Sequence, residues 1–141
     1  MFDNLFINAW GGYTAPTGLQ DYSKTLATHK KIIDKGMSFC VFPEGGISHD
    51  GSVRPARGGI AYLAEYNKCP IIPVGCSGLY GISVKDFFTR KRHVVISFGK
   101  AITQEELKNN VMHSKKEEGN VYKEEAEYVV GIMRDLVKNR L

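Results

Sequence analysis

A lone carboxylate, two glycines and two arginines form the group of residues in this chain that is best suited to chemistry. Glu44 follows an apolar run at 37–42, the glycines occupy 45–46, and Arg54 and Arg57 come next. Glycine permits positive φ and lets the backbone approach a bound group closely. A carboxylate accepts hydrogen bonds from hydroxyls, and guanidinium groups bind phosphate oxygens through paired N–H donors. The group therefore suits a polyol that carries a phosphate, and the alternative is a glycine turn whose acid caps nearby backbone.

Residues 46–50 (Gly-Ile-Ser-His-Asp) begin like the nucleophile elbow of a hydrolase. The fifth position is Asp50, however, and Gly51 and Pro55 interrupt the strand-turn-helix spacing that the elbow needs. A hydrolase is therefore not favoured.

His29 and Asp34 match the letters of an H-x4-D pair. On a regular helix, residues five apart point about 140° away from each other, because each residue turns the helix by about 100°. A histidine that is satisfied or half-exposed on its helix is the simpler interpretation. We therefore treat this pair as coincidental and assign no catalytic residue.

The elements that would position these residues alternate between strands and helices. Apolar runs predict strands at 37–43, 69–76 and 93–99. Helical spacing and capping signals predict helices at 19–35 (ending at Gly36), at 60–66, after Thr103, and from about Tyr122 to Val137. We expect an α/β fold with a mixed, largely parallel sheet flanked by helices, in a single domain over 1–141.

The composition indicates an ordinary globular protein. The chain has 141 residues, of which 43% are hydrophobic and 24% charged, and its net charge is +4. A charge this mild suits anionic lipid or a phosphorylated substrate better than nucleic acid. No apolar run is long enough to span a membrane, and the three cysteines lack zinc or disulfide spacing, so we expect a reducing, cytoplasmic setting and no bound metal or cofactor.

The ordered motifs of the chain resemble the phospholipid/glycerol acyltransferase family. Phe-Pro-Glu-Gly at 42–45, the residues up to Gly59, and Pro-Ile-Ile-Pro-Val at 70–74 look like its third and fourth motif blocks. The run at 99–102 resembles the strand end that follows them. The resemblance implies transfer of a fatty acyl group, in phospholipid biosynthesis, from acyl-CoA or an acyl-carrier protein to a lysophospholipid or glycerol-phosphate hydroxyl.

The resemblance also implies roles for particular residues. Glu44 and Gly45 would bind the acceptor, Arg57 would contact its phosphate, and Pro73 and Val74 would line the pocket. The family's catalytic H-x4-D should lie upstream of 10–13, where this chain has no histidine, and the arginine and Thr-Arg expected near the second and third blocks are absent.

Two hypotheses follow from these departures. The first is the C-terminal portion of an acyltransferase, incomplete at its N-terminus and inactive without its catalytic block. The alternative is a non-catalytic lipid-binding module with the same fold.

Residues 79–92 mix aliphatic and aromatic side chains with basic ones. Such a segment suits peripheral contact with anionic lipid on the cytoplasmic face of a membrane, and the alternative is a basic loop over the edge of an aromatic core.

Overall fold

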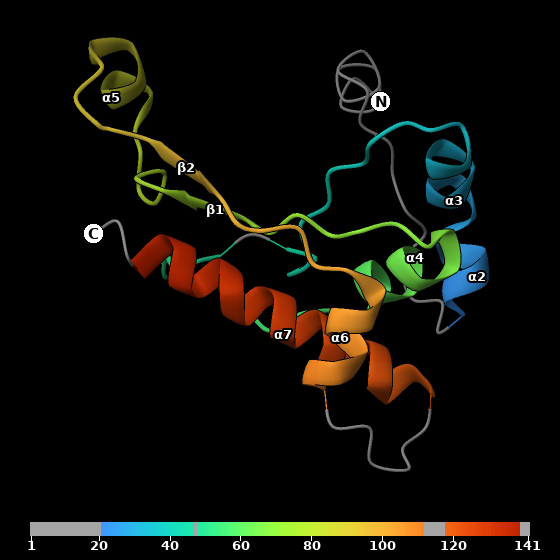
Figure 1. Cartoon of the computed structure of the whole chain (residues 1–141). Coiled ribbons are helices and arrows are strands. Elements are labelled where there is room, and N and C mark those ends of the chain that lie inside the picture. The colour runs from blue at the N-terminus through green and yellow to red at the C-terminus, as the bar shows by residue number, and fades with distance from the viewer. Residues whose placement is uncertain (1–20, 47, 112–117, 139–141) are drawn as a thin grey trace.

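The computed structural model describes residues 21–46, 48–111 and 118–138 (Figure 1). In chain order the elements are α2 (Tyr22–Thr25), α3 (Ala27–Asp34), α4 (Gly59–Asn67), β1 (Val74–Ser77), α5 (Val84–Thr89), β2 (Val95–Phe98), α6 (Gln104–Asn110) and α7 (Glu118–Lys138). The long helix α7 runs along one side of the β1–β2 ribbon, α4 lies with α2 and α3 towards one end, and α5 is at the far tip of the ribbon. The element expected at 5–16 lies outside the described residues.

The final helix is the framework of the core. Its apolar side chains recur at helical spacing, as the sequence predicts, and one face packs against α4, α6 and β1. The main cluster of buried apolar side chains contains Ala56, Ile60, Ile102, Leu107, Ala126, Val129 and Val130. Because α7 contacts α4, α6 and both strands, it holds the loop after Glu44, the small sheet and α6 on one apolar surface.

Local capping signals are confirmed at two helix ends. Gly36 adopts a φ of +75° just after α3, and its N–H donates to the Ile33 carbonyl at 2.8 Å. At the start of α6, the Thr103 hydroxyl accepts from the Glu106 N–H at 3.2 Å. The helix expected at 60–66 is also confirmed, as α4.

The single helix expected over 19–35 is instead divided at Leu26 into α2 and α3. The Thr25 hydroxyl donates to the Asp21 carbonyl at 2.9 Å, alongside the Thr25 N–H at 3.1 Å. Such side-chain bonding to the preceding turn bends helices. The hydrogen bond of the Thr25 hydroxyl therefore accompanies a break in the helix, although the apolar spacing continues across it.

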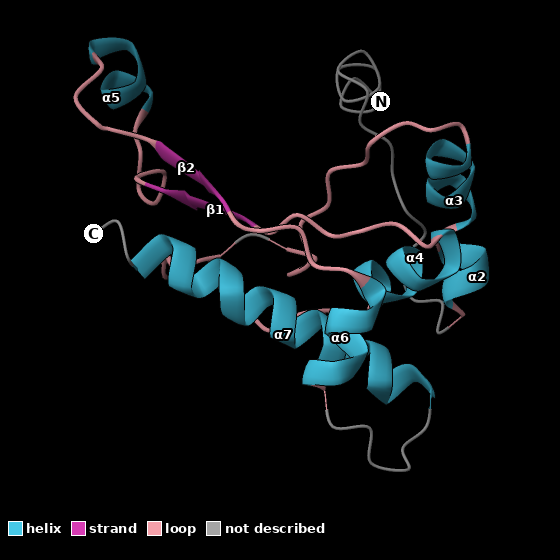
Figure 2. Cartoon of the chain, in the orientation of Figure 1, coloured by secondary structure: helices cyan, strands magenta, loops and turns pink. Residues whose placement is uncertain are grey.

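The expected parallel sheet is wrong for the part of the chain that the structure describes. There, β1 and β2 form a two-stranded antiparallel ribbon (Figure 2). Val74 lies opposite Phe98, and Ser77 lies opposite Val95. The chain leaves β1, forms α5 and returns alongside, which is the geometry of a long hairpin rather than of a crossover. The observed class is a mixed one, with helices and one small sheet.

The strand expected at 37–43 is also not formed. Residues 37–42 are irregular backbone, and Phe42 is 78% exposed. An apolar run becomes a strand only where a neighbouring strand supplies hydrogen bonds, and the run at 37–42 is paired with neither β1 nor β2. Composition alone therefore overestimated the strand content here.

Candidate acceptor site

The Phe-Pro-Glu-Gly segment forms a turn that is fastened to a distant loop. The Gly45 N–H donates to the Phe42 carbonyl at 3.1 Å, and Gly45 has a φ of +62°. The Pro43 carbonyl accepts from the Arg57 N–H at 2.8 Å, and Pro43 is buried. The turn predicted from the two glycines is therefore confirmed, and it is fixed in position by backbone bonding.

Glu44 binds the same loop at Arg54. Its Oε2 atom accepts a hydrogen bond from the Arg54 N–H at 2.7 Å. A hydrogen bond to a charged carboxylate is stronger than one between neutral groups. One carboxylate oxygen therefore positions Arg54, so Glu44 has a structural role as well as the binding role that the resemblance implies.

The two arginine side chains lie against the two glycines. A Cβ atom built on Gly45 would lie 2.6 Å from Nε and 2.7 Å from Cδ of Arg57, and one on Gly46 would lie 2.6 Å from Nη1 of Arg54. A side chain at Gly45 would displace the middle of the Arg57 side chain, and one at Gly46 would displace only the flexible end of Arg54. The structure therefore brings together Glu44, Gly45 and both arginines, and Arg57 is exposed to solvent.

A carboxylate on α7, which sequence reasoning missed, holds this loop against the core. Oε2 of Glu127 accepts from the Ala56 N–H at 2.8 Å, and Arg134 pairs with Oε1 at 2.6 Å. The Ala56 N–H, and then Arg134, lower the pKa of Glu127 below its usual value. Because Ala56 adjoins Arg57, this bond fixes the backbone from which the Arg57 side chain extends.

Pro73 and Val74 lie at the start of β1. Pro73 is fully buried, and its carbonyl accepts from the Gly99 N–H at 2.8 Å. Val74 is half-buried on β1, opposite Phe98. The structure packs both residues against β2 and its end, and their role as pocket lining stays a prediction.

His29 and Asp34 differ in their surroundings. His29 is buried on α3, with its ring edge-on to Phe39 at a centroid distance of 4.7 Å, and burial lowers its pKa. Asp34, at the end of the same helix, is exposed. His29 is therefore a core histidine and Asp34 a surface carboxylate.

The short loop that resembles a nucleophile elbow is organised around an acid. Asp50 accepts from the Ser52 hydroxyl at 2.7 Å, the Ser52 N–H at 2.9 Å and the Ser48 hydroxyl at 3.1 Å. These bonds, led by that from the Ser52 hydroxyl, lower the pKa of Asp50 to about 2. The Ser48 hydroxyl thus donates to a carboxylate that shapes a loop.

Two features of the described residues bear on the class of site. Within residues 21–46, 48–111 and 118–138, no three His, Cys, Asp or Glu side chains gather as a metal site. Over the same ranges, no helix combines the length and the apolar character needed to cross a membrane.

The chain belongs to the acyltransferase family, because the family profile described as Acyltransferase matches residues 3–77, more than half of its length. It is also similar to 1-acyl-sn-glycerol-3-phosphate acyltransferase alpha of Mus musculus, with 33% identity over 69 residues. That match covers 49% of this chain and 22% of the mouse protein. No solved structure matches the chain. The family match contains the whole cluster around Glu44, whereas residues 99–102 and α7 lie beyond it.

Proposed function

We propose that this chain forms the acceptor-binding part of a glycerophospholipid acyltransferase. The reaction would move a fatty acyl group from acyl-CoA or an acyl-carrier protein to a hydroxyl of a lysophospholipid or glycerol phosphate. Family membership supports acyl transfer as the chemistry. The observation that carries the choice of acceptor is the exposed Arg57 side chain lying against Gly45, the residue that follows Glu44.

Each residue of the cluster has a distinct role in this proposal. The Arg57 guanidinium binds the acceptor phosphate through paired N–H donors. The Glu44 carboxylate accepts from an acceptor hydroxyl while its Oε2 keeps the Arg54 backbone in place. Gly45 leaves room for both the arginine and the ligand. Pro73 and Val74 line the apolar side of the pocket.

The transfer step also needs a base. The acceptor hydroxyl oxygen bonds to the thioester carbonyl carbon, its proton passes to the base, and the carbon–sulfur bond breaks to release the thiol carrier, which regains a proton. The burial of His29 and the exposure of Asp34 do not suit that pair to the step. We therefore assign the base to no residue of this chain and expect these 141 residues alone to be inactive.

A second candidate function is favoured by the same histidine geometry. A chain that has the acceptor cluster, but whose His29 is buried while Asp34 is exposed, suits a non-catalytic lipid-binding module. The in-frame sequence upstream of Met1 distinguishes the two functions. An H-x4-D there would favour the enzyme, and a stop codon directly before Met1 would favour the module.

Ligand binding tests the acceptor site directly. Lysophosphatidic acid, titrated calorimetrically below its micelle concentration, should bind the chain. We expect Arg57→Ala to weaken that binding by roughly tenfold to a hundredfold, since a hydrogen bond to a charged group contributes about 1.5–3 kcal/mol. Lys31→Ala removes an exposed cation from α3 and should leave the affinity unchanged.

Two results would contradict these proposals. If both Arg57→Ala and Glu44→Ala bound lysophosphatidic acid with unchanged affinity, the acceptor site would not be at these residues. Acyl transfer by the chain itself that is abolished in His29→Ala would show that the dismissed pair is catalytic.

A further inference from the structure

Residues 79–94 form an arm that extends from the β1–β2 ribbon and carries the short helix α5 (Figure 1). We call this segment the α5 arm. It contains none of the residues assigned to the acceptor site, so an inference about it goes beyond the proposed function.

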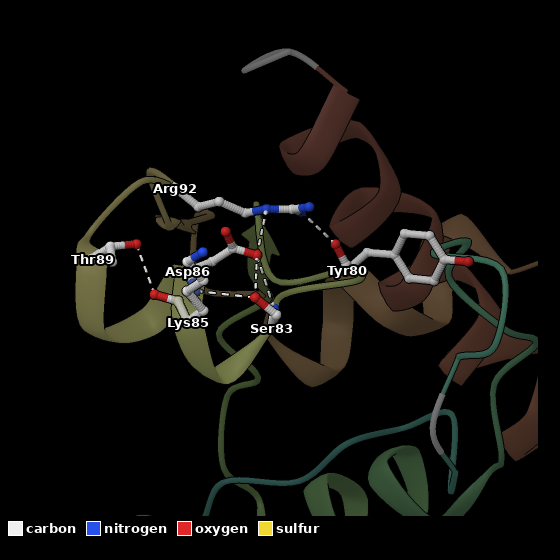
Figure 3. Close-up of polar contacts among 6 residues, drawn as sticks. All are labelled: Tyr80, Ser83, Lys85, Asp86, Thr89 and Arg92. Carbon is white, nitrogen blue, oxygen red and sulfur yellow. Dashed lines mark hydrogen bonds and ion pairs between the residues drawn. The ribbon is translucent and has the colours of Figure 1, made fainter.

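A set of polar contacts holds the arm in shape (Figure 3). At the start of α5, the Ser83 N–H donates to Oδ2 of Asp86 at 3.1 Å, and the Asp86 N–H donates to the Ser83 hydroxyl oxygen at 3.1 Å. This reciprocal pattern is a capping box. Arg92 approaches the same carboxylate at 4.0 Å and donates to the Tyr80 carbonyl at 2.7 Å. The two sides of the arm are thereby fastened together at its base.

Several large apolar side chains of the arm are exposed. Val84 and Phe88 are 75% and 77% exposed, and they lie four residues apart, on one face of α5. Leu79 and Tyr80, just before the helix, are about half exposed, at 48% and 58%. Large apolar side chains gathered on a protruding element are typical of a contact surface.

The charges around these apolar side chains are almost all positive. Lys85, Arg90 and Lys91 are exposed, and Arg92 is the fourth cation of the arm. The arm has one carboxylate, Asp86, and its hydrogen bonds to Ser83 and ion pair with Arg92 use it internally. The arm therefore presents apolar side chains flanked by cations, with no exposed acid between them.

An open hollow of about 600 Å³ lies in the same arm. Its lining combines apolar side chains with basic ones: Ile82, Phe88, Val94, Arg90, Arg92 and His93, along with Asp86. A space lined by both apolar and basic side chains suits a lipid headgroup with its phosphate.

We propose that the α5 arm docks on an anionic phospholipid surface. Val84 and Phe88 enter the boundary between headgroups and acyl chains, while Lys85, Arg90 and Lys91 contact the lipid phosphates. Amphipathic elements bind membranes in this way, and each basic residue near an anionic leaflet adds to the attraction. Lysine and arginine stems are long enough to lie along apolar surface while their charges reach the phosphates.

The shape and charge of the arm favour lipid over other partners. A stable protein interface buries about 1,200–2,000 Å² in total, which is large for the tip of one short arm. Nucleic-acid surfaces favour a charged face, and they would leave Val84 and Phe88 in water. A lipid surface accommodates the apolar and cationic groups together.

Vesicle flotation tests the proposal with the whole chain. We expect it to bind vesicles of phosphatidylcholine mixed with phosphatidylglycerol, to bind pure phosphatidylcholine weakly, and to dissociate at high salt. Phe88→Ala should reduce binding by roughly tenfold, and the double variant Lys85→Ala, Lys91→Ala by roughly thirtyfold. Circular dichroism should show unchanged helix content, since these side chains are exposed.

Matched variants outside the arm control for non-specific hydrophobic and electrostatic binding to vesicles. Phe42→Ala removes an aromatic side chain that is 78% exposed outside the arm, and Lys31→Ala, Lys35→Ala removes two exposed cations from the α3 region. Both should leave vesicle binding unchanged. Soluble glycerol phosphate should not displace the chain from vesicles, because it offers no apolar surface.

Three outcomes would overturn the proposal. One is vesicle binding that does not depend on anionic lipid, and another is an equal loss of binding in the Phe42 or Lys31/Lys35 controls. The third is that the arm variants alter self-association in the ultracentrifuge and leave vesicle binding intact, which would make the arm a protein interface. None of these outcomes would bear on acceptor binding by Arg57.

Discussion

Arg57 lies against a glycine that no larger residue can replace without moving it. A methyl group at Gly45 would lie 2.6 Å from Nε of Arg57, and the positive φ at this position also disfavours any residue with a side chain. Gly45 therefore affects the site through two properties, the space that it leaves for Arg57 and the positive φ that it adopts. One experiment can separate these two effects. The sequence indicates the turn, and the contact with Arg57 appears only in the structure.

Gly45→Ala should weaken lysophosphatidic acid binding by about tenfold and lower stability by about 1–2 kcal/mol. Gly36→Ala is the matched control, because Gly36 has a φ of +75° but a methyl group added there would meet nothing within 4 Å. It should lose a similar amount of stability and keep its affinity for the ligand. Equal affinities of the two variants in calorimetry would show that Arg57 is not positioned by Gly45.

His29 predicts a pH dependence of stability. Burial lowers its pKa in the folded state, whereas the unfolded value is about 6.5. The unfolded chain therefore binds more protons just below pH 6.5. The contribution of neutral His29 to the free energy of unfolding should be fully present above about pH 6.5. It should decline as the pH falls towards the pKa of His29 in the folded state.

Urea denaturation between about pH 7 and pH 5 measures this effect, since the shifted carboxylates titrate at lower pH. His29→Leu should flatten the decline. His93→Gln, at an exposed position on the arm, should leave it unchanged. A decline that persists fully in His29→Leu would assign the dependence to another group.

At the scale of elements, α7 organises the candidate site as well as the core. Glu127 accepts from the Ala56 N–H at 2.8 Å and ties the Arg57 loop to the helix. The same helix packs against β1, and a two-stranded ribbon is only marginally stable without such support. The site and the sheet therefore share one structural support.

Glu127→Ala should lower the free energy of unfolding by about 1–3 kcal/mol, because it leaves the Ala56 N–H without its acceptor. It should also weaken ligand binding through the neighbouring Arg57. Glu127→Gln keeps an acceptor and should lose less stability. Asp135→Ala, an exposed acid on the same helix, should change stability by less than about 0.5 kcal/mol in urea denaturation. Equal losses in the Glu127 and Asp135 variants would contradict the role of this bond.

At the scale of the molecule, the candidate site and the proposed lipid contact belong to different parts of the fold. Glu44 and Arg57 lie in the loop anchored to α7, and the α5 arm extends from the tip of the ribbon. The Tyr80 hydroxyl donates to the His49 carbonyl at 3.0 Å, so the base of the arm contacts the loop that follows the glycine turn. An arm docked on lipid would therefore keep the acceptor loop close to the membrane surface.

The sequence by itself determined the features that depend on neighbouring residues. The glycine turn at 45–46, the end of α3 at Gly36, the cap of α6 at Thr103 and the apolar face of α7 are set by interactions within a few residues. The membership in the acyltransferase family is likewise carried by the order of its motifs.

Tertiary structure decided the features that join distant parts of the chain. The bond between Ala56 and Glu127 spans 71 positions, and no local pattern announces it. The apolar run at 37–42 has the composition of a strand, but in the folded chain it lies in neither strand of the β1–β2 sheet. The hydrogen-bond partners in sheets, and between loops and helices, depend on which distant segments the fold brings together. Local composition does not predict them.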